Sequence, residues 1–160
     1  MFEIISCGAI LLASCYIGRY FKKHYKSRHF MMTEFYKLAE YIRLEIHFKK
    51  TEATDILKNF TTENTEVKGI ITGIIFARKT GAPTAEVLKS NLLKDERKLL
   101  TEFFDKLGTK DIESEISDID LFLGKLKKIT EQTEKDIKLK GDLYFKLSIL
   151  IGLAVCVIFI

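Results

Sequence analysis

At 160 residues, the chain is long enough for one domain of ordinary size. Its 26 Lys and Arg residues against 22 Asp and Glu residues give a net charge of only +4. Basic and acidic side chains alternate along the middle of the sequence, which argues against a groove for nucleic acid. The two ends are apolar: Glu3 and Arg19 are the only charged residues before Lys22, and none follows Lys146. The sequence therefore predicts a polar middle segment between two ends that a membrane could accept.

The apolar segment at residues 1–21 predicts a transmembrane helix. As a helix it is about 30 Å long, which matches the hydrocarbon core of a bilayer. The positive charges follow this segment rather than precede it, unlike those of a secretory signal. The basic residues are Arg19, near the end of the segment, and Lys22, Lys23, Lys26 and Arg28, which come after it. Their positive charges place the C-terminal side of the segment in the cytoplasm. The alternative is a buried helix of a soluble protein, flanked by charge.

Residues 22–146 predict a cytoplasmic bundle of about six helices, and the chain as a whole is therefore expected to be all-α. Apolar residues recur every three or four positions on the first helix, which is typical of a helix with one buried face. Thr51 is the predicted N-cap of a short second helix. The recurring apolar residues of the first helix are Phe35, Leu38, Ile42 and Ile46.

Three further helices are predicted at residues 67–80, 83–93 and 94–107, with Gly81 ending the first and Gly108 the last. The helix at 67–80 contains Gly69 and Gly73 in a GxxxG pattern. Its apolar run of about 11 residues is too short to cross a bilayer. We expect it to be the most buried helix of the bundle, with both glycines allowing a close helix crossing; a third membrane segment is the alternative.

A long helix is predicted from Lys110 toward Tyr144, capped by Thr109 and unbroken by proline. Apolar residues repeat along it with a spacing of about 3.5 residues. Its start is acidic, as the helix dipole favours. Three of these acids are predicted to share one face and to form a candidate binding surface for a basic partner, opposite a core-facing stripe. The three acids are Asp111, Glu115 and Asp118, and the stripe is Ile112, Ile116 and Ile119. A solvated helix face is the alternative to a binding surface, and a metal site is disfavoured.

The chain ends in LSILIGLAVCVIFI, residues 147–160. As a helix these fourteen residues cover only about 21 Å, less than the roughly 30 Å of hydrocarbon core. Counted from Gly141, the segment has about 20 residues, and Tyr144, Phe145 and Lys146 resemble an interfacial belt. We therefore predict a second transmembrane helix whose hydrophobic core is 147–160; a buried helix of a soluble protein is the alternative.

Small residues recur at every fourth position of this second span. Ser148, Gly152 and Cys156 would let another helix approach closely in lipid. The alternative is that small residues are simply common in spans.

Catalytic patterns are missing from the sequence. None of the three His residues forms an HExxH or ExxH pattern. The segment TGAPTAE lacks the Lys and the spacing of a phosphate-binding loop. We therefore expect no enzymatic activity, no metal and no cofactor.

The segment LTEFFDKLGTKDIESEISDIDLFL, together with the apolar C-terminus, resembles the stage III sporulation protein AB family of endospore-forming bacteria. The family pattern of a Phe four residues before Leu-Gly, with an Asp three residues after the Gly, is met at Phe103, Leu107, Gly108 and Asp111. Weaker echoes of the family occur at Glu45, at Thr51 and at Gly152. The chain departs from the pattern at Glu52, Phe104 and Glu115.

The resemblance implies a non-enzymatic part of the channel complex between mother cell and forespore. It implies a protein of the mother-cell membrane that faces the forespore, with a cytoplasmic middle domain similar to that of the type II secretion platform protein. The implied partners are the ATPase-like stage III sporulation protein AA, other membrane proteins of the complex and the lipid bilayer. The alternative is a helical membrane protein that acts through its spans alone, in membrane morphogenesis or permeability.

Overall fold

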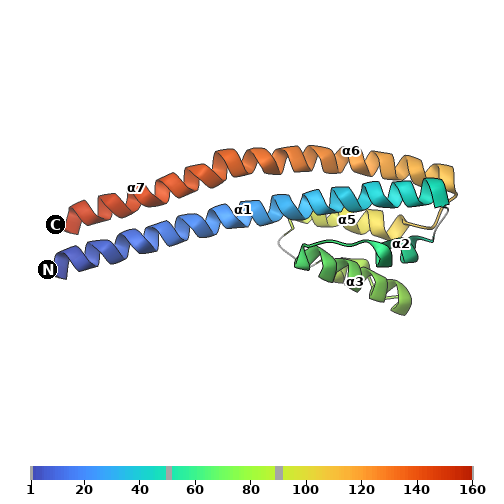
Figure 1. Cartoon of the computed structure of the whole chain (residues 1–160), viewed down its shortest axis with the longest axis horizontal. Coiled ribbons are helices and arrows are strands. Elements are labelled where there is room, and N and C mark those ends of the chain that lie inside the picture. Colours follow the sequence, from blue (N-terminus) through green and yellow to red (C-terminus); the bar gives the residue numbers. More distant parts are fainter. Residues whose placement is uncertain (1, 50–51, 89–91, 160) are drawn as a thin grey trace. The chain divides into compact units, whose positions relative to one another are not determined.

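The computed structural model describes residues 2–49, 52–88 and 92–159, and every regular element in these ranges is helical (Figure 1). The predicted all-α class is confirmed. The helices are α1 (Phe2–Lys49), α2 (Ala53–Asn59), α3 (Thr65–Thr80), α4 (Thr84–Val87), α5 (Lys94–Lys106), α6 (Ile112–Asp136) and α7 (Asp142–Phe159). A π-helical turn, η1 (Ile137–Gly141), joins α6 to α7 without a break in the helix.

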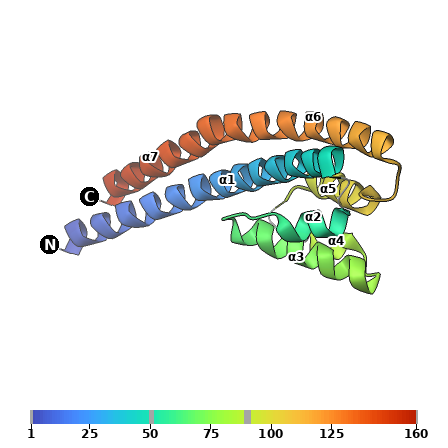
Figure 2. The same cartoon turned by 45° about the vertical axis from the view of Figure 1, so that its right-hand side comes forward.

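The chain forms two compact units. Unit 1 comprises Met1–His29 and Glu131–Ile160, and unit 2 comprises Phe30–Thr130. In unit 1 the N-terminal half of α1 and helix α7 run side by side, with the start of α1 and the end of α7 at the same end of the pair (Figures 1 and 2). In unit 2 the short helices α2, α3 and α4 lie together, as Figure 2 shows.

The core of unit 2 is built on the predicted stripe of α1. Phe35, Leu38 and Ile42 are each no more than 1% exposed, and Ile46 is also buried. Phe104 of α5 meets Phe35 edge to face at 6.3 Å, and Phe103 stacks on Phe122 of α6 at 3.8 Å. Aromatic pairs of this kind add to the burial of their surface. The apolar spacing of α1 thus predicts the side of the helix that the shorter helices cover.

The ends of the helices in unit 2 agree with the sequence in part. Gly81 and Gly108 follow α3 and α5 with φ angles of 73° and 80°, in the left-handed region that glycine adopts at helix ends. The predicted N-cap Thr51 lies outside the described residues. The predicted cap Thr109 is wrong: Asp111 precedes α6, and its Oδ2 accepts a hydrogen bond from the Ser114 backbone N–H at 3.1 Å.

The two glycines of α3 differ in their surroundings. A Cβ added to Gly73 would collide with the Val87 side chain of α4, whereas one added to Gly69 would meet nothing within 4 Å. Phe76 on the same helix is 66% exposed. The prediction that both glycines allow a close crossing is therefore right for Gly73 and wrong for Gly69, because α3 has one face turned to solvent.

Candidate functional site

The C-terminus of α5, the start of α6 and the last turn of α3 meet at one place in unit 2, and Arg78 is at its centre. Its Nη2 donates hydrogen bonds to the backbone oxygens of Phe104 at 2.6 Å and Leu107 at 2.8 Å. These carbonyls belong to the end of α5, where backbone oxygens have no partner within the helix. The Arg78 guanidinium thus caps a neighbouring helix at the end where the dipole favours a positive charge.

Glu115 of α6 completes this polar junction. Only 7% of the residue is exposed, and its Oε1 accepts a hydrogen bond from the backbone N–H of Gly108. Burial lowers the pKa of the Arg78 guanidinium, and the negative charges of Glu115 and Asp105 oppose that effect. A partly buried cation, a buried carboxylate and the loop after α5 therefore stabilise one another.

A pocket of about 330 Å³ lies beside the junction. Gly108 is tightly enclosed here, because a Cβ on it would lie 3.1 Å from the Ala53 side chain. Two carboxylates, those of Glu52 and Glu115, and the Arg78 guanidinium line the pocket. Its lining consists of Ile46, Glu52, Ala53, Thr54, Arg78, Gly108, Ile112 and Glu115.

Most of the residues that carry the family resemblance gather around this junction. Leu107 is buried, Gly108 has a positive φ and Asp111 caps α6. Phe103 forms the stack on Phe122. Glu45 precedes Ile46 of the pocket wall on α1, and Thr51 lies outside the described residues. Most of the residues that match the family pattern therefore lie at the turn between α5 and α6.

The three acidic candidates for partner binding do not share one exposed face. Glu115 is buried, whereas Ile112 of the predicted core stripe is 38% exposed. The expected orientation of this helix turn was wrong because the loop N–H of Gly108 and the Arg78 charge draw Glu115 inward. Asp118 pairs with Lys110 at 2.5 Å, and Asp111 is used as the cap. Binding of a basic partner by these acids stays a prediction; Asp111 is exposed, and Asp118 is partly exposed.

Asp118 also borders a groove between α5 and α6. The groove has a volume of about 200 Å³ and an apolar floor formed by Leu99, Phe103 and Phe122. Leu121 lies at its edge and is 65% exposed. The charged rim consists of Glu102, Lys106, Asp118 and Lys125.

The small residues predicted to pack between spans lie in unit 1. A Cβ on Gly18 of α1 would collide with the Ser148 side chain, and one on Gly152 would lie 2.6 Å from Ser14 Oγ. Cys156 is buried. The structure thus brings Ser148 and Gly152 against small residues of α1, as close helix packing requires.

Arg78 is the residue that the sequence prediction missed. It occurs four positions after Ile74 and directly after Ala77, both of which are buried. The signal in the sequence was a single Arg at the helical spacing of a buried apolar stripe, which indicates a cation on the core side of α3.

The family model for stage III sporulation protein AB matches residues 3–160. The chain belongs to this family. No curated protein and no solved structure is significantly similar to it. Family membership confirms the resemblance drawn from the turn between α5 and α6, and it indicates a role in stage III of sporulation.

A membrane location fits this family member. Within the described residues, the helix Ile112–Ile158 is long and apolar enough to cross a bilayer, by length and composition alone. The N-terminal span at residues 1–21 stays a prediction, as do the boundaries of the bundle at 22 and 146 and the C-terminal span at 147–160.

Proposed function

We propose that the chain is a non-enzymatic adaptor of the sporulation channel complex. In this proposal unit 2 is held at the cytoplasmic surface of the mother-cell membrane and binds the ATPase-like stage III sporulation protein AA. The observation that carries the proposal is the family match over residues 3–160. The all-helical fold of unit 2 and its own hydrophobic core support it.

Anchoring at both ends is supported by unit 1. Large apolar side chains point outward from both of its helices, where they would contact lipid rather than water. Leu12 and Tyr16 of α1 are more than 70% exposed, as are Val157 and Ile158 of α7. Gly18 and Gly152 let the two helices pair closely, so we propose that they enter the bilayer together.

We place the docking surface for the ATPase at the groove between α5 and α6. It combines an apolar floor with the exposed side chain of Leu121 and the carboxylate of Asp118. An apolar centre with a charged rim is typical of protein interfaces. The junction around Arg78 would then hold the two helices that form the groove in place.

Co-purification of the full chain with protein AA, in mild detergent, tests this proposal. Leu121→Asp removes an exposed apolar contact and should weaken binding at least about tenfold, as loss of an interface anchor does. Leu44→Asp is the matched control, because Leu44 is also exposed, at 51%, but belongs to α1. Circular dichroism should show both variants folded.

Equal binding by Leu121→Asp and the parent chain would exclude this groove. No binding of protein AA by the parent chain would contradict the adaptor proposal itself.

A further inference from the structure

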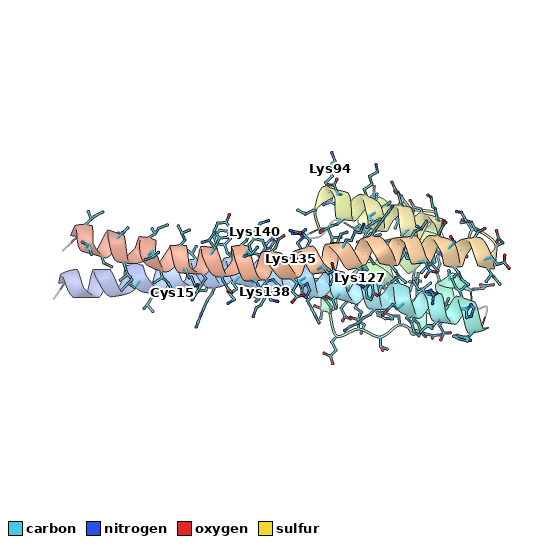
Figure 3. All side chains as sticks on the ribbon, turned by 90° about the horizontal axis from the view of Figure 1, so that it is seen from above. Cys15, Lys94, Lys127, Lys135, Lys138 and Lys140 are labelled. Atoms are coloured by element: carbon cyan, nitrogen blue, oxygen red, sulfur yellow. The ribbon has the colours of Figure 1, made fainter. Side chains whose placement is uncertain are left out.

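Basic side chains gather on unit 1 in a band that we call the collar, residues 19–28 and 136–146. At one end of the collar Arg28 lies 3.6 Å from Asp136, and beyond the other end Gly18 packs against Ser148. The collar contains eight Lys and Arg residues and two Asp residues, an excess of six positive charges. The whole chain has a net charge of only +4, so the rest of it is negative by two. Lys138 and Lys140 mark the part of the collar formed by η1 (Figure 3).

The two acidic residues of the collar have partners within unit 1. Asp136 pairs with Lys140 at 2.8 Å as well as with Arg28, and Asp142 pairs with Lys22 at 2.7 Å. Lys23, Lys26 and Lys146 are exposed, and no salt bridge among the described residues engages them. Lys138 pairs with Glu134, just outside the collar, at 2.8 Å. The charges of Lys23, Lys26 and Lys146 are therefore the ones presented outward.

Aromatic rings lie at the same level as these lysines. Tyr25 and Tyr144 stack across the two helices with ring centres 6.3 Å apart, and Phe21 lies 5.7 Å from Tyr144. Toward the chain ends the surface becomes apolar, with Leu150 and Ile151 both more than half exposed. An aromatic girdle between a basic band and an apolar surface is the order of groups found at the headgroup level of a bilayer.

We infer that the collar binds the headgroups of anionic phospholipids. Exposed ammonium groups on long, flexible side chains are suited to lipid phosphates, and the adjoining apolar surface continues into the acyl chains of the same lipids. A soluble anionic partner would leave that apolar surface uncovered. The inference rests on the proposed membrane anchoring and adds to it a preference for anionic over zwitterionic lipid, carried by Lys23, Lys26 and Lys146.

Quenching of a single tryptophan by brominated lipids tests the inference. The chain contains no Trp, so Tyr144→Trp in the full-length protein gives one reporter at the collar. The protein is reconstituted in phosphatidylcholine vesicles that contain brominated phosphatidylglycerol or brominated phosphatidylcholine. The ratio of the two quenching curves gives the relative binding constant of the anionic lipid.

We expect phosphatidylglycerol to be favoured, and the preference to fall when Lys23, Lys26 and Lys146 are all changed to Gln. Each lysine near a membrane surface contributes at most about a fivefold change in the relative binding constant, which sets the upper limit of that fall. The matched control changes Lys94, Lys127 and Lys128 to Gln, which removes three exposed charges from unit 2. Figure 3 labels Lys94 and Lys127. Added salt should reduce the preference, whereas inorganic phosphate at equal ionic strength should have no further effect.

Equal quenching by both brominated lipids would overturn the inference while leaving the anchoring intact. Absence of quenching by either lipid would instead contradict the proposed anchoring. If the triple variant fails to fold, as shown by circular dichroism, the salt dependence of the parent protein decides: a preference that salt leaves unchanged would also overturn the inference.

Discussion

Alanine at the two glycines of α3 should have opposite effects on the stability of unit 2. Replacing Gly by Ala in a helix interior stabilises by up to about 1 kcal/mol. Gly69 is exposed with open space around it, so Gly69→Ala should show this full gain. At Gly73 the new methyl group would press on Val87, whose Cβ and Cγ2 would each lie 3.5 Å away while Cγ1 would be closer still. Overpacking of this kind costs about 1–3 kcal/mol and would cancel or exceed the gain.

Thermal unfolding of a fragment covering residues 30–130, followed by circular dichroism, measures the difference. For a domain of this size, 1 kcal/mol corresponds to roughly 4–8 °C in Tm. Gly69→Ala should therefore melt at least about 4 °C above Gly73→Ala, and Gly73→Leu should melt lower than either. Equal Tm values for the two alanine variants would show that α4 does not press on α3, and the packing argument would fail.

Three further predictions concern polar groups of unit 2. Asp111→Ala should lower Tm, whereas Asp111→Asn should retain it, because Asn also accepts the Ser114 N–H hydrogen bond at an N-cap. Glu115→Lys should destabilise by roughly 3 kcal/mol in urea unfolding, because it places a second cation beside Arg78, and Glu115→Gln should cost much less. Burial raises the pKa of Glu34, but hydrogen bonds from Lys37 and Thr62 outweigh it and hold the pKa below its usual value. The stabilisation that Glu34 contributes is thus present at neutral pH and is lost as the pH falls through its lowered pKa, so Glu34→Gln should flatten the fall of Tm in acid.

The helices of unit 2 were predictable because their signals are local. The stripe from Phe35 to Ile46 needs only the helical period, and Gly81 needs only its own conformational freedom. Both predictions depend on residues close in sequence, and both are confirmed.

The candidate site was harder to predict because its partners are distant in sequence. Glu115 is acidic and would be assigned to solvent by its type alone, yet it is buried against a loop N–H and near a cation from α3. A buried carboxylate is tolerated only when such partners exist, and no periodicity within α6 reveals them. The same limit explains why Ile112 was assigned to the core although it is 38% exposed.

The π-helical turn η1 leads to a last prediction, about the pairing of helices in unit 1. A π-turn holds one residue more than the α-helical turn it replaces. The helices before and after it therefore present the same faces as they would in a continuous α-helix that lacked the extra residue. Each residue of an α-helix turns the next by about 100°. Deleting Leu139 should therefore convert η1 to α-helix and leave Ser148 facing Gly18. Deleting both Lys138 and Leu139, which are exposed, should rotate Ser148 away by about 100°.

Disulfide formation between Gly18→Cys and Ser148→Cys reports this facing, in a background where Cys7, Cys15 and Cys156 are changed to Ser. A Cβ on Gly18 would adjoin the Ser148 side chain, which meets the short Cβ separation that a disulfide requires. The cross-link should form in the full-length chain and after the single deletion but not after the double deletion. Efficient cross-linking after the double deletion would mean that the small residues do not fix the pairing of α1 with α7. Loss of the cross-link after the single deletion would show instead that η1 is needed for the pairing, because the turn itself brings Gly141 against Lys22 and Tyr25 of α1.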